Sequence, residues 1–470
     1  MAPDTTPTGE AAPGAAPMAR LGSLEAGEGR LRRVGLRGLS EEDREALVRR
    51  SAGTGADVRR QAREVVDAVR AGGDEALHEL GARLGGAWTD GITDGSPAGT
   101  AAPLRVPAAR LRAEADALPP GLRDALLLMA RNIEAFHRVQ VPAPAQWVDI
   151  SPGIRVGRVW RPLDRVGVYV PGGEAAYPSS LLMCVVPARL AGVGAIAVAS
   201  PAGRDGRLSP ALLGAAGLLR IEEFYAVGGA QAIGALALGT ATVRAVDAIV
   251  GPGNAWVTAA KLEVLGEVGI DMPAGPSEVM VLADGSADPA HVAADLLSQA
   301  EHGPDSAAVL VATDALVADR VEFEIARRLP HEPRLGFLAA SLGSAGLIVV
   351  ADGIDDGIDF VNQYAPEHLS VAVEGAADLL PRIRHAGSVF LGTYAPESAG
   401  DYATGSNHVL PTGRLARARG PLAVEDFGHW MQAQLVDREG LASIASAVGI
   451  VADAEGLVAH RHAIEARFES

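Results

Sequence analysis

Residues 166–173 read VGVYVPGG, residues 224–231 read FYAVGGAQ, and residues 246–254 read VDAIVGPGN. Each stretch is a short apolar run that ends in glycine, and at least the last two continue into helical segments. A strand that ends in glycines and leads into a helix is typical of a parallel sheet. Such turns gather at the carboxyl edge of the sheet, where free helix N–H groups bind phosphates. The pattern therefore predicts a ligand site, although plain connecting turns are an equally good interpretation of these turns alone.

Outward from these turns, the strand candidates form two series. The first comprises Val166–Val170, Ala195–Ser200, Phe224–Val227 and Val246–Val250, and the second comprises Val279–Ala283, Ala308–Thr313, Leu347–Ala351, Leu369–Val373 and Ser388–Leu391. Segments rich in Ala and Leu separate them, which is typical of βαβ units. Nearly continuous apolar strands indicate parallel sheets that are covered on both faces. The sequence predicts an α/β protein with two doubly wound, Rossmann-like parallel-sheet domains and helical N-terminal and C-terminal segments.

This interpretation divides the chain into five parts. They are a disordered tail rich in Pro, Ala, Gly and Thr (1–30), an N-terminal helical segment (31–160), a first Rossmann-like domain (161–275), a second one (276–412) and a helical C-terminal segment (413–470). Within the second part, Ser40 followed by three acidic residues predicts the start of a helix, and residues 58–70 repeat apolar side chains at helical spacing. Residues 90–102 predict a surface loop.

The composition excludes several classes of function. The 470 residues carry 58 acidic and 41 basic side chains, and the formal net charge of −17 disfavours DNA or RNA as a partner. Cys184 is the one cysteine, which excludes an intramolecular disulfide, and its apolar neighbours predict a buried, unreactive thiol. No run approaches the ~20 apolar residues that span a bilayer, and no signal peptide is apparent. We therefore expect a cytoplasmic protein without nucleic-acid or membrane partners.

One glycine motif is misleading. Residues 192–197 read GVGAIA and fit the dinucleotide-binding fingerprint. They follow a helical segment and lead into a strand candidate, whereas a phosphate-binding loop must follow a strand and begin a helix. We interpret this motif as a helix end and a turn.

A first candidate for metal binding is the pair formed by Gln299 and His302. A helix is predicted at residues 289–299, with Asp288 as its N-cap and proline at its first position. Side chains three residues apart share one face of a helix, so this pair has a suitable geometry for Zn²⁺. Gln is an uncommon zinc ligand, and the spacing alone favours a purely structural interpretation.

A candidate acid–base pair, Glu367 and His368, directly precedes a strand candidate. Histidine is suited to proton abstraction near neutral pH, and a carboxylate can activate water. Judged from its immediate sequence neighbours alone, the pair could also be a solvent-exposed pair in a loop, without a function. Residues 396–408, which read PESAGDYATGSNH, form a long polar stretch after the last strand candidate. So many polar groups in a loop that leaves a sheet favour a site over a simple connection.

Together these motifs resemble those of the histidinol dehydrogenase family. The similarity includes the three glycine turns, DMPAGPSE at residues 271–278, and residues 298–306, 362–369 and 398–412. It runs from about residue 161 to the C-terminus, with looser similarity from residue 31. The resemblance implies an enzyme that uses NAD and one Zn²⁺ per subunit. It also implies two successive oxidations of L-histidinol, through L-histidinal to L-histidine, as the last step of histidine biosynthesis.

The resemblance also implies roles for individual residues. The implied zinc ligands are Gln299, His302, Asp401 and His460, and the implied catalytic acid–base residues are Glu367 and His368. The implied NAD contacts are Tyr169, Gln231 and Asn254, and the implied substrate contacts are Ser277, Gln299, His302, His368, Asp401, Glu455 and His460. The resemblance further implies a homodimer in which the C-terminal segment crosses to the partner, so that Glu455 and His460 complete the other subunit's site.

Two other functions are compatible with parts of this pattern. A paralogous zinc- and NAD-dependent dehydrogenase could oxidise another small alcohol, such as a sulfonated diol. A zinc hydrolase could use Glu367 to activate metal-bound water, but the chain lacks the H-E-x-x-H motif and carries three glycine turns that a hydrolase does not need. The retained set of substrate contacts favours histidinol.

Overall fold

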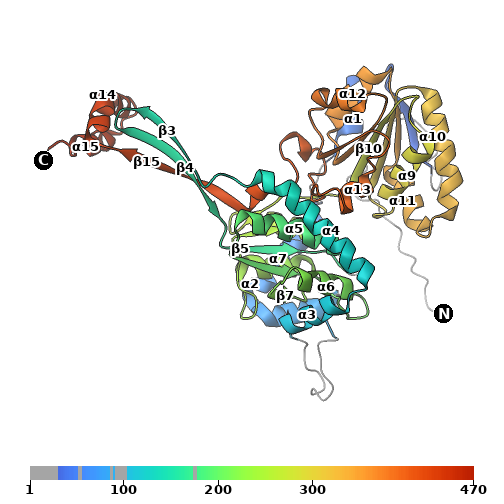
Figure 1. Ribbon diagram of the computed structural model, residues 1–470, viewed down its shortest axis with the longest axis horizontal. Coiled ribbons are helices and arrows are strands. Elements are labelled where there is room, and N and C mark those ends of the chain that lie inside the picture. Colours follow the sequence, from blue (N-terminus) through green and yellow to red (C-terminus); the bar gives the residue numbers. More distant parts are fainter. Residues whose placement is uncertain (1–29, 51–54, 85–87, 90–102, 173–176, 470) are drawn as a thin grey trace, which may run out of the picture.

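The computed structural model describes residues 30–50, 55–84, 88–89, 103–172 and 177–469. They fold into two parallel-sheet units that lie side by side, and a long thin arm extends away from both (Figure 1). The predicted α/β class with two doubly wound sheets is confirmed. The predicted loop at 90–102 and all but the last residue of the predicted tail lie outside the described residues.

The first sheet has six strands in the order β2-β7-β6-β5-β8-β9, and only β2, at one edge, is antiparallel to its neighbour. The strands are β2 (Arg105–Val106), β5 (Arg165–Tyr169), β6 (Ala195–Ala199), β7 (Glu223–Tyr225), β8 (Ala248–Val250) and β9 (Gly269–Ile270). One face packs against α2 (Ala56–Leu84), α7 (Gly229–Leu238) and α8 (Ala255–Glu263). The other face packs against α3 (Ala108–Ala117), α4 (Pro120–His137), α5 (Pro178–Ala191) and α6 (Pro210–Leu218).

The order of this sheet creates a crevice at one edge. From β5 the chain moves outward through β6 to β7, and it then returns to the other side of β5 as β8. At such a reversal the loops on the two sides diverge at the carboxyl ends of the strands, which is where open α/β sheets bind ligands. The three glycine turns follow β5, β7 and β8, so the fold gathers them at this crevice.

The second sheet also has six strands, all parallel, in the order β1-β12-β11-β10-β13-β14. The strands are β1 (Arg32–Gly35), β10 (Glu278–Ala283), β11 (Ala307–Ala312), β12 (Leu347–Val350), β13 (His368–Ala372) and β14 (Ser388–Leu391). One face packs against α9 (Pro289–Ala300), α10 (Ala315–Arg328) and α11 (Leu335–Ala345), and the other packs against α1 (Glu41–Val48) and α12 (Ile354–Tyr364). A short helix, α13 (Glu397–Tyr402), follows β14.

Two predicted helix starts are confirmed. The Ser40 side chain caps α1 by accepting a hydrogen bond from the Asp43 N–H at 3.1 Å. The Asp288 carboxylate caps α9 in the same way, with the Ala290 N–H at 2.8 Å. Because α9 follows β10 and runs back along the sheet, its last turn lies at the amino edge, where β10 and β13 begin.

The arm consists of three antiparallel strands, β3 (Ala145–Ser151), β4 (Ile154–Pro162) and β15 (Gly428–Val436). At its far end it carries α14 (Arg438–Ala454) and α15 (Val458–Glu465), well separated from both sheet units (Figure 1). Besides their helices, the two predicted end segments also contain strands, namely β1, β2, β3, most of β4, and β15.

These strands were missed because they carry little apolar signal. Most residues of β3 and β15 are exposed, so neither strand needs the continuous apolar run that marks a core strand. The edge strand β1 is only four residues long and its residues are half-buried or exposed. In the described ranges, no helix combines the length and apolar character needed to cross a membrane.

Candidate active site

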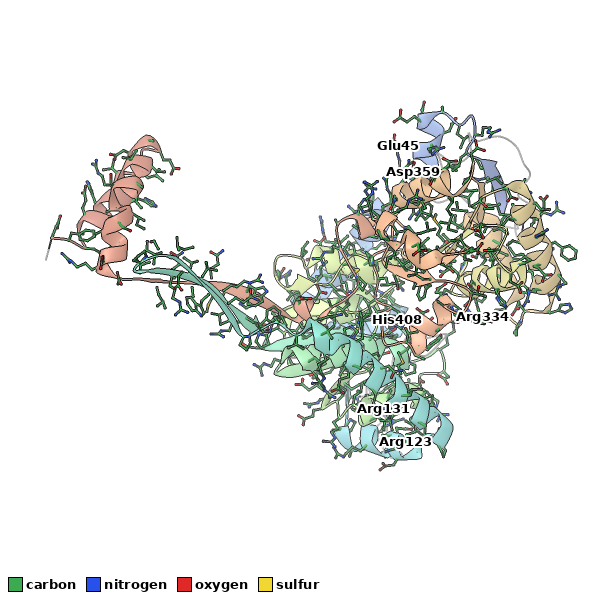
Figure 2. The ribbon with its side chains drawn as sticks, turned by 45° about the horizontal axis from the view of Figure 1, so that its top comes forward. Glu45, Arg123, Arg131, Arg334, Asp359 and His408 are labelled. Carbon is green, nitrogen blue, oxygen red and sulfur yellow. The ribbon has the colours of Figure 1, made fainter. Side chains whose placement is uncertain are left out.

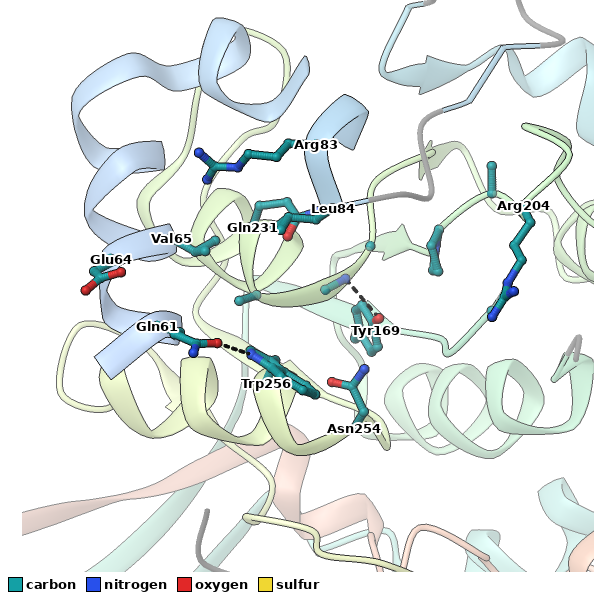
Figure 3. A pocket seen from close by; sticks show the side chains of 16 residues that line it. Gln61, Glu64, Val65, Arg83, Leu84, Tyr169, Arg204, Gln231, Asn254 and Trp256 are labelled. Carbon is teal, nitrogen blue, oxygen red and sulfur yellow. Dashed lines mark hydrogen bonds between the residues drawn. The ribbon is translucent and has the colours of Figure 1, made fainter. Parts of the chain in front are cut away.

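A cavity of about 800 Å³ lies at the carboxyl edge of the first sheet. The three glycine turns line it through Tyr169 and Gly172, through residues 228–231, and through Asn254 (Figure 3). Helix α2 forms the opposite wall with Gln61, Glu64, Val65, Arg83 and Leu84. A cavity of this size at the reversal of a parallel sheet is suited to a dinucleotide or one half of it.

Tyr169 connects the first two turns. Its phenol oxygen accepts a hydrogen bond from the Gly229 N–H at 3.1 Å. Burial raises the pKa of Tyr169, so the ring stays neutral at physiological pH. Gly229 has a φ of +67°, and a Cβ at Gly228 would lie 2.2 Å from the Cβ of Pro201. Both positions therefore require glycine.

The third turn ends at Asn254, whose side chain caps α8 by accepting a hydrogen bond from the Val257 N–H at 3.1 Å. Two residues later, the Trp256 ring borders the cavity, and its Nε1–H donates to Gln61 Oε1 of α2 at 3.2 Å (Figure 3). The capped start of α8 therefore lies directly beside the cavity.

Glu367 and His368 lie at the start of β13, and both side chains are buried. His368 is paired with Val279 of β10, so the two residues lie at the amino edge of the second sheet. This is the opposite edge from the one at which open α/β sheets usually bind ligands. Only residues 271–277 separate β9 of the first sheet from β10, so this amino edge is linked to the end of the first sheet by a segment of roughly 30 Å at most.

The surroundings of His368 determine which of its two ring nitrogens carries the proton in the neutral ring. Nδ1 lies 3.2 Å from the carbonyl oxygen of Glu278. A carbonyl only accepts hydrogen bonds, so Nδ1 carries the proton and Nε2 has a free lone pair in the neutral ring. Nε2 lies 3.5 Å from Asp401 Oδ1, and no hydrogen bond satisfies it. In its neutral form, the His368 ring therefore offers a buried base at Nε2.

Carboxylates surround the same ring. Nδ1 lies 3.6 Å from Glu367 Oε2 and 3.8 Å from Glu397 Oε1. Burial by itself lowers the pKa of His368, but the charges of Glu367 and Glu397 raise it well above its usual range overall. Burial raises the pKa of Glu367, whose Oε2 accepts the Glu278 N–H at 2.7 Å. Burial raises the pKa of Glu397 to about 8.

Several buried polar atoms at this edge have no hydrogen-bond partner. They are both oxygens of Glu397, Nε2 of His368, and both polar atoms of the fully buried Gln299 side chain. Each such atom costs about 1–3 kcal/mol when it stays unsatisfied. In addition, ligand atoms of His368, Glu397 and Asp401 lie within 4.8 Å of one another. The imidazole, carboxylate and amide groups here fit a divalent cation and a polar ligand.

The last turn of α9 faces the same cluster. Helices α9 and α13 pack against each other. Burial raises the pKa of Asp401, but the neighbouring His368 and, to a lesser extent, His408 and His302 lower it overall. Asp295 of α9 likewise contributes to the raised pKa of Glu397. The end of α9, which carries Gln299, and the turn that follows it, which carries His302, therefore lie near Asp401.

The histidinol dehydrogenase family profile matches residues 48–468. The chain belongs to the histidinol dehydrogenase family. It is 46% identical over 407 residues to histidinol dehydrogenase from Gluconobacter oxydans, covering 87% of this chain and 92% of that protein. It is 46% identical over 433 residues to that of Halobacterium salinarum, covering 92% and 98%. The crystal structure of the Elizabethkingia anophelis histidinol dehydrogenase superimposes with a TM-score of 0.85 at 36% identity, covering 93% of this chain and 98% of that one.

For this histidinol dehydrogenase family member, the structure gathers most of the predicted site residues at two places. The predicted NAD contacts Tyr169, Gln231 and Asn254 line the cavity. The residues at or next to the amino edge of the second sheet are Ser277, Gln299, His302, Glu367, His368 and Asp401. The chemical roles of these residues remain predictions.

Two predicted residues lie elsewhere. Both are exposed at the far end of the arm. Glu455 lies just after α14, and His460 lies within α15. Within one chain the structure does not bring them to Gln299, His302 or Asp401 (Figure 1). A role for Glu455 and His460 at such a site stays a prediction.

Two residues of the site were missed by sequence reasoning. Glu397 lies in the polar stretch 396–408, which the sequence indicates as a possible site. Nothing in its sequence context indicates that its carboxylate faces His368. His408 ends the same stretch, and it lies at the junction of the two sheet units (Figure 2). Its Nδ1 lies 3.0 Å from the carbonyl oxygen of Asp401, and its Nε2 lies 3.0 Å from Ser180 Oγ of α5. His408 thereby fixes the end of α13 against the first sheet unit.

Proposed function

We propose that this chain oxidises L-histidinol through L-histidinal to L-histidine in two successive NAD-linked steps, with one zinc ion per subunit. The observation that carries the proposal is the group of buried, unpartnered polar atoms of Gln299, His368 and Glu397. L-Histidinol offers an imidazole and an amine. These groups can pair with the unpartnered protein atoms, or with a cation that the protein atoms surround.

Gln299, His302 and Asp401 hold the zinc ion in this proposal, and His460 of the partner subunit completes the set. When bound, zinc supplies Lewis-acid coordination of the substrate nitrogens, and NAD⁺ in the cavity of the first sheet accepts hydride. The unsatisfied Gln299 side chain and the lowered pKa of Asp401, whose charge His368 stabilises despite burial, support this donor set.

His368 acts on the alcohol in the first step. Its Nε2 takes the proton of the substrate's hydroxyl group while a hydride leaves the carbon that bears this group. The alcohol thereby becomes the aldehyde. The Nδ1–H remains on the Glu278 carbonyl, so the ring keeps its orientation during proton transfer. The neighbouring carboxylates stabilise the imidazolium that forms, as the raised pKa of His368 indicates.

Glu367 acts in the second step. Its carboxylate takes a proton from water while the water oxygen bonds to the aldehyde carbon. His368 returns the proton from the first step, through Nε2–H, to the aldehyde oxygen, which gives the hydrate and restores the neutral ring. His368 Nε2 then takes a hydroxyl proton from the hydrate as a second hydride leaves, and the acid forms. The raised pKa of Glu367, caused mainly by burial, makes its carboxylate a stronger base for water. Retaining the aldehyde in a buried site protects a reactive intermediate.

The proposed active unit is a homodimer in the cytoplasm. The arm exposes a series of large apolar side chains, including Val148 and Ile150 at 61% and Ile450 at 68%. Single exposed apolar residues are ordinary, but a series along one projecting element favours coverage by a partner. A second copy of this chain is the partner that would both cover these apolar side chains and give Glu455 and His460 a role. The predicted absence of nucleic-acid and membrane partners is retained, supported by the net charge of −17.

The direct test measures NADH formed per L-histidinol consumed by the purified, zinc-loaded protein. We expect two NADH per substrate, loss of this activity after chelation, and recovery when zinc is added back. A sulfonated diol, the substrate class of the alternative dehydrogenase, should give no NADH. One NADH per substrate, or full activity after verified zinc removal, would contradict the proposal.

A further inference from the structure

Lys261 is the only lysine in the chain, and it is buried on α8, beneath the third glycine turn. Its Nζ donates to Asp271 Oδ1 at 2.7 Å and to the carbonyl oxygen of Gly251 at 2.5 Å. The other carboxylate oxygen of Asp271 accepts the Gly251 N–H at 2.8 Å. The ion pair therefore binds both hydrogen-bonding groups of the Gly251 backbone.

The position of Gly251 matters for the cavity. Its φ is +112°, and a Cβ there would lie 2.1 Å from the carbonyl oxygen of Tyr169. The ion pair thus holds Gly251 tightly against the end of β5. Tyr169 in turn holds the Gly229 N–H through its phenol. A continuous set of contacts connects Lys261 and Asp271 to all three turns that line the cavity.

The same pair also fixes the start of the segment between the sheets. Asp271 Oδ1 accepts the Met272 N–H at 2.7 Å, and the backbone oxygen of Asp271 accepts a hydrogen bond from Arg419. Thr258, three residues before the lysine, donates to the Ala274 carbonyl at 2.6 Å. The third turn is therefore anchored to the segment that leads to the second sheet.

An ion pair buried this deeply is a weak means of stabilising a fold, because removing two charges from water offsets most of their attraction. Lys261 and Asp271 have side-chain exposures of 3% and 1%. Their contacts with one glycine backbone point instead to control of the local geometry. Arg165 and Glu223 form another ion pair of this sheet, at 2.6 Å, with Arg165 buried and Glu223 23% exposed. They begin β5 and β7 and so lie at the opposite edge of the same sheet.

We infer that Lys261 and Asp271 are positioning residues that set the affinity for NAD⁺ by holding the Gly251 turn in its binding geometry. The inference rests on the proposed use of the cavity by NAD⁺. Neither side chain lines the cavity, so both act through the Gly251 backbone.

The test compares Lys261→Met with Glu223→Gln in the zinc-loaded dimer, using calorimetric titration with NAD⁺ and, separately, with L-histidinol. Methionine retains the length of the side chain but donates no hydrogen bond. We expect the Kd for NAD⁺ to rise about ten- to a hundredfold in Lys261→Met, as the loss of a charged hydrogen bond predicts. Its zinc content and its Kd for L-histidinol should stay unchanged. Glu223→Gln should lower the melting temperature without changing the Kd for NAD⁺.

The possible outcomes separate this inference from the proposed function. If the wild-type protein does not bind NAD⁺, the proposed function is wrong. If the wild type binds NAD⁺ and Lys261→Met binds it equally well, only the inference is wrong. An equal loss of NAD⁺ affinity in Glu223→Gln would also contradict it, because an ion pair remote from the cavity would then have the same effect. If Lys261→Met does not fold, Asp271→Asn must show the weakened NAD⁺ binding, and failure of both variants to fold would make the pair purely structural.

Discussion

Replacing His368 with alanine abolishes formation of L-histidinal, with a fall in kcat of about 10²–10⁴-fold, the range typical of a lost general base. The reason is that Nε2 of His368 is a buried base whose other nitrogen is fixed by the Glu278 carbonyl. The measurement is a single-turnover reaction with L-histidinol and excess NAD⁺, followed by NADH fluorescence. No burst of NADH should appear.

The control for His368→Ala is the zinc content of the variant. His368 belongs to a group whose ligand atoms lie close enough to share a cation with Glu397 and Asp401. The proposed ligand set does not include His368, so zinc content and NAD⁺ affinity should match those of the wild type. A variant that lost zinc in parallel with activity would identify His368 as a metal ligand and contradict its assignment as the base.

Replacing Glu367 with glutamine should separate the two oxidations. The amide oxygen can still accept the Glu278 N–H, so the local fold is retained, but the side chain no longer takes a proton from water. We expect the first oxidation to proceed at a rate near that of the wild type. Conversion of L-histidinal should slow by about a hundredfold or more.

Product analysis checks this separation. Glu367→Gln should release or retain L-histidinal and form one NADH per L-histidinol, whereas the wild type forms two. Supplying L-histidinal directly should give almost no NADH with the variant. If both oxidations slow to the same extent, the division of labour between Glu367 and His368 is wrong.

The sequence was sufficient to predict those elements that a local residue pattern specifies. Apolar runs that end in glycine predicted the central strands within a few residues, and the N-caps Ser40 and Asp288 predicted two helix starts. The order of strands and helices then predicted parallel sheets, and parallel sheets gather turns at one edge. That is why the three glycine turns, which are far apart in the chain, could be predicted to meet, whereas Tyr169, Gln231 and Asn254 were indicated only by the family resemblance.

The remaining features depend on tertiary contacts that no local pattern encodes. The position of the Glu397 carboxylate beside His368 follows from how α13 packs after β14. The arm strands lack an apolar face within the chain, so they show no core-strand pattern. The role of Lys261 is equally invisible in sequence, because a single lysine on a helix is ordinarily solvated.

In the proposed dimer, each active site combines the buried cluster of one subunit with the arm of the other. This arrangement is tested by forming mixed dimers from His368→Ala and His460→Asn, each carrying a different affinity tag, and isolating the doubly tagged species. One site then carries both substitutions, and the other carries intact His368 with intact His460 from the partner subunit. The account predicts about half of the wild-type activity per mixed dimer. A mixed dimer no more active than either parent, with full zinc in the His460→Asn parent, would contradict it.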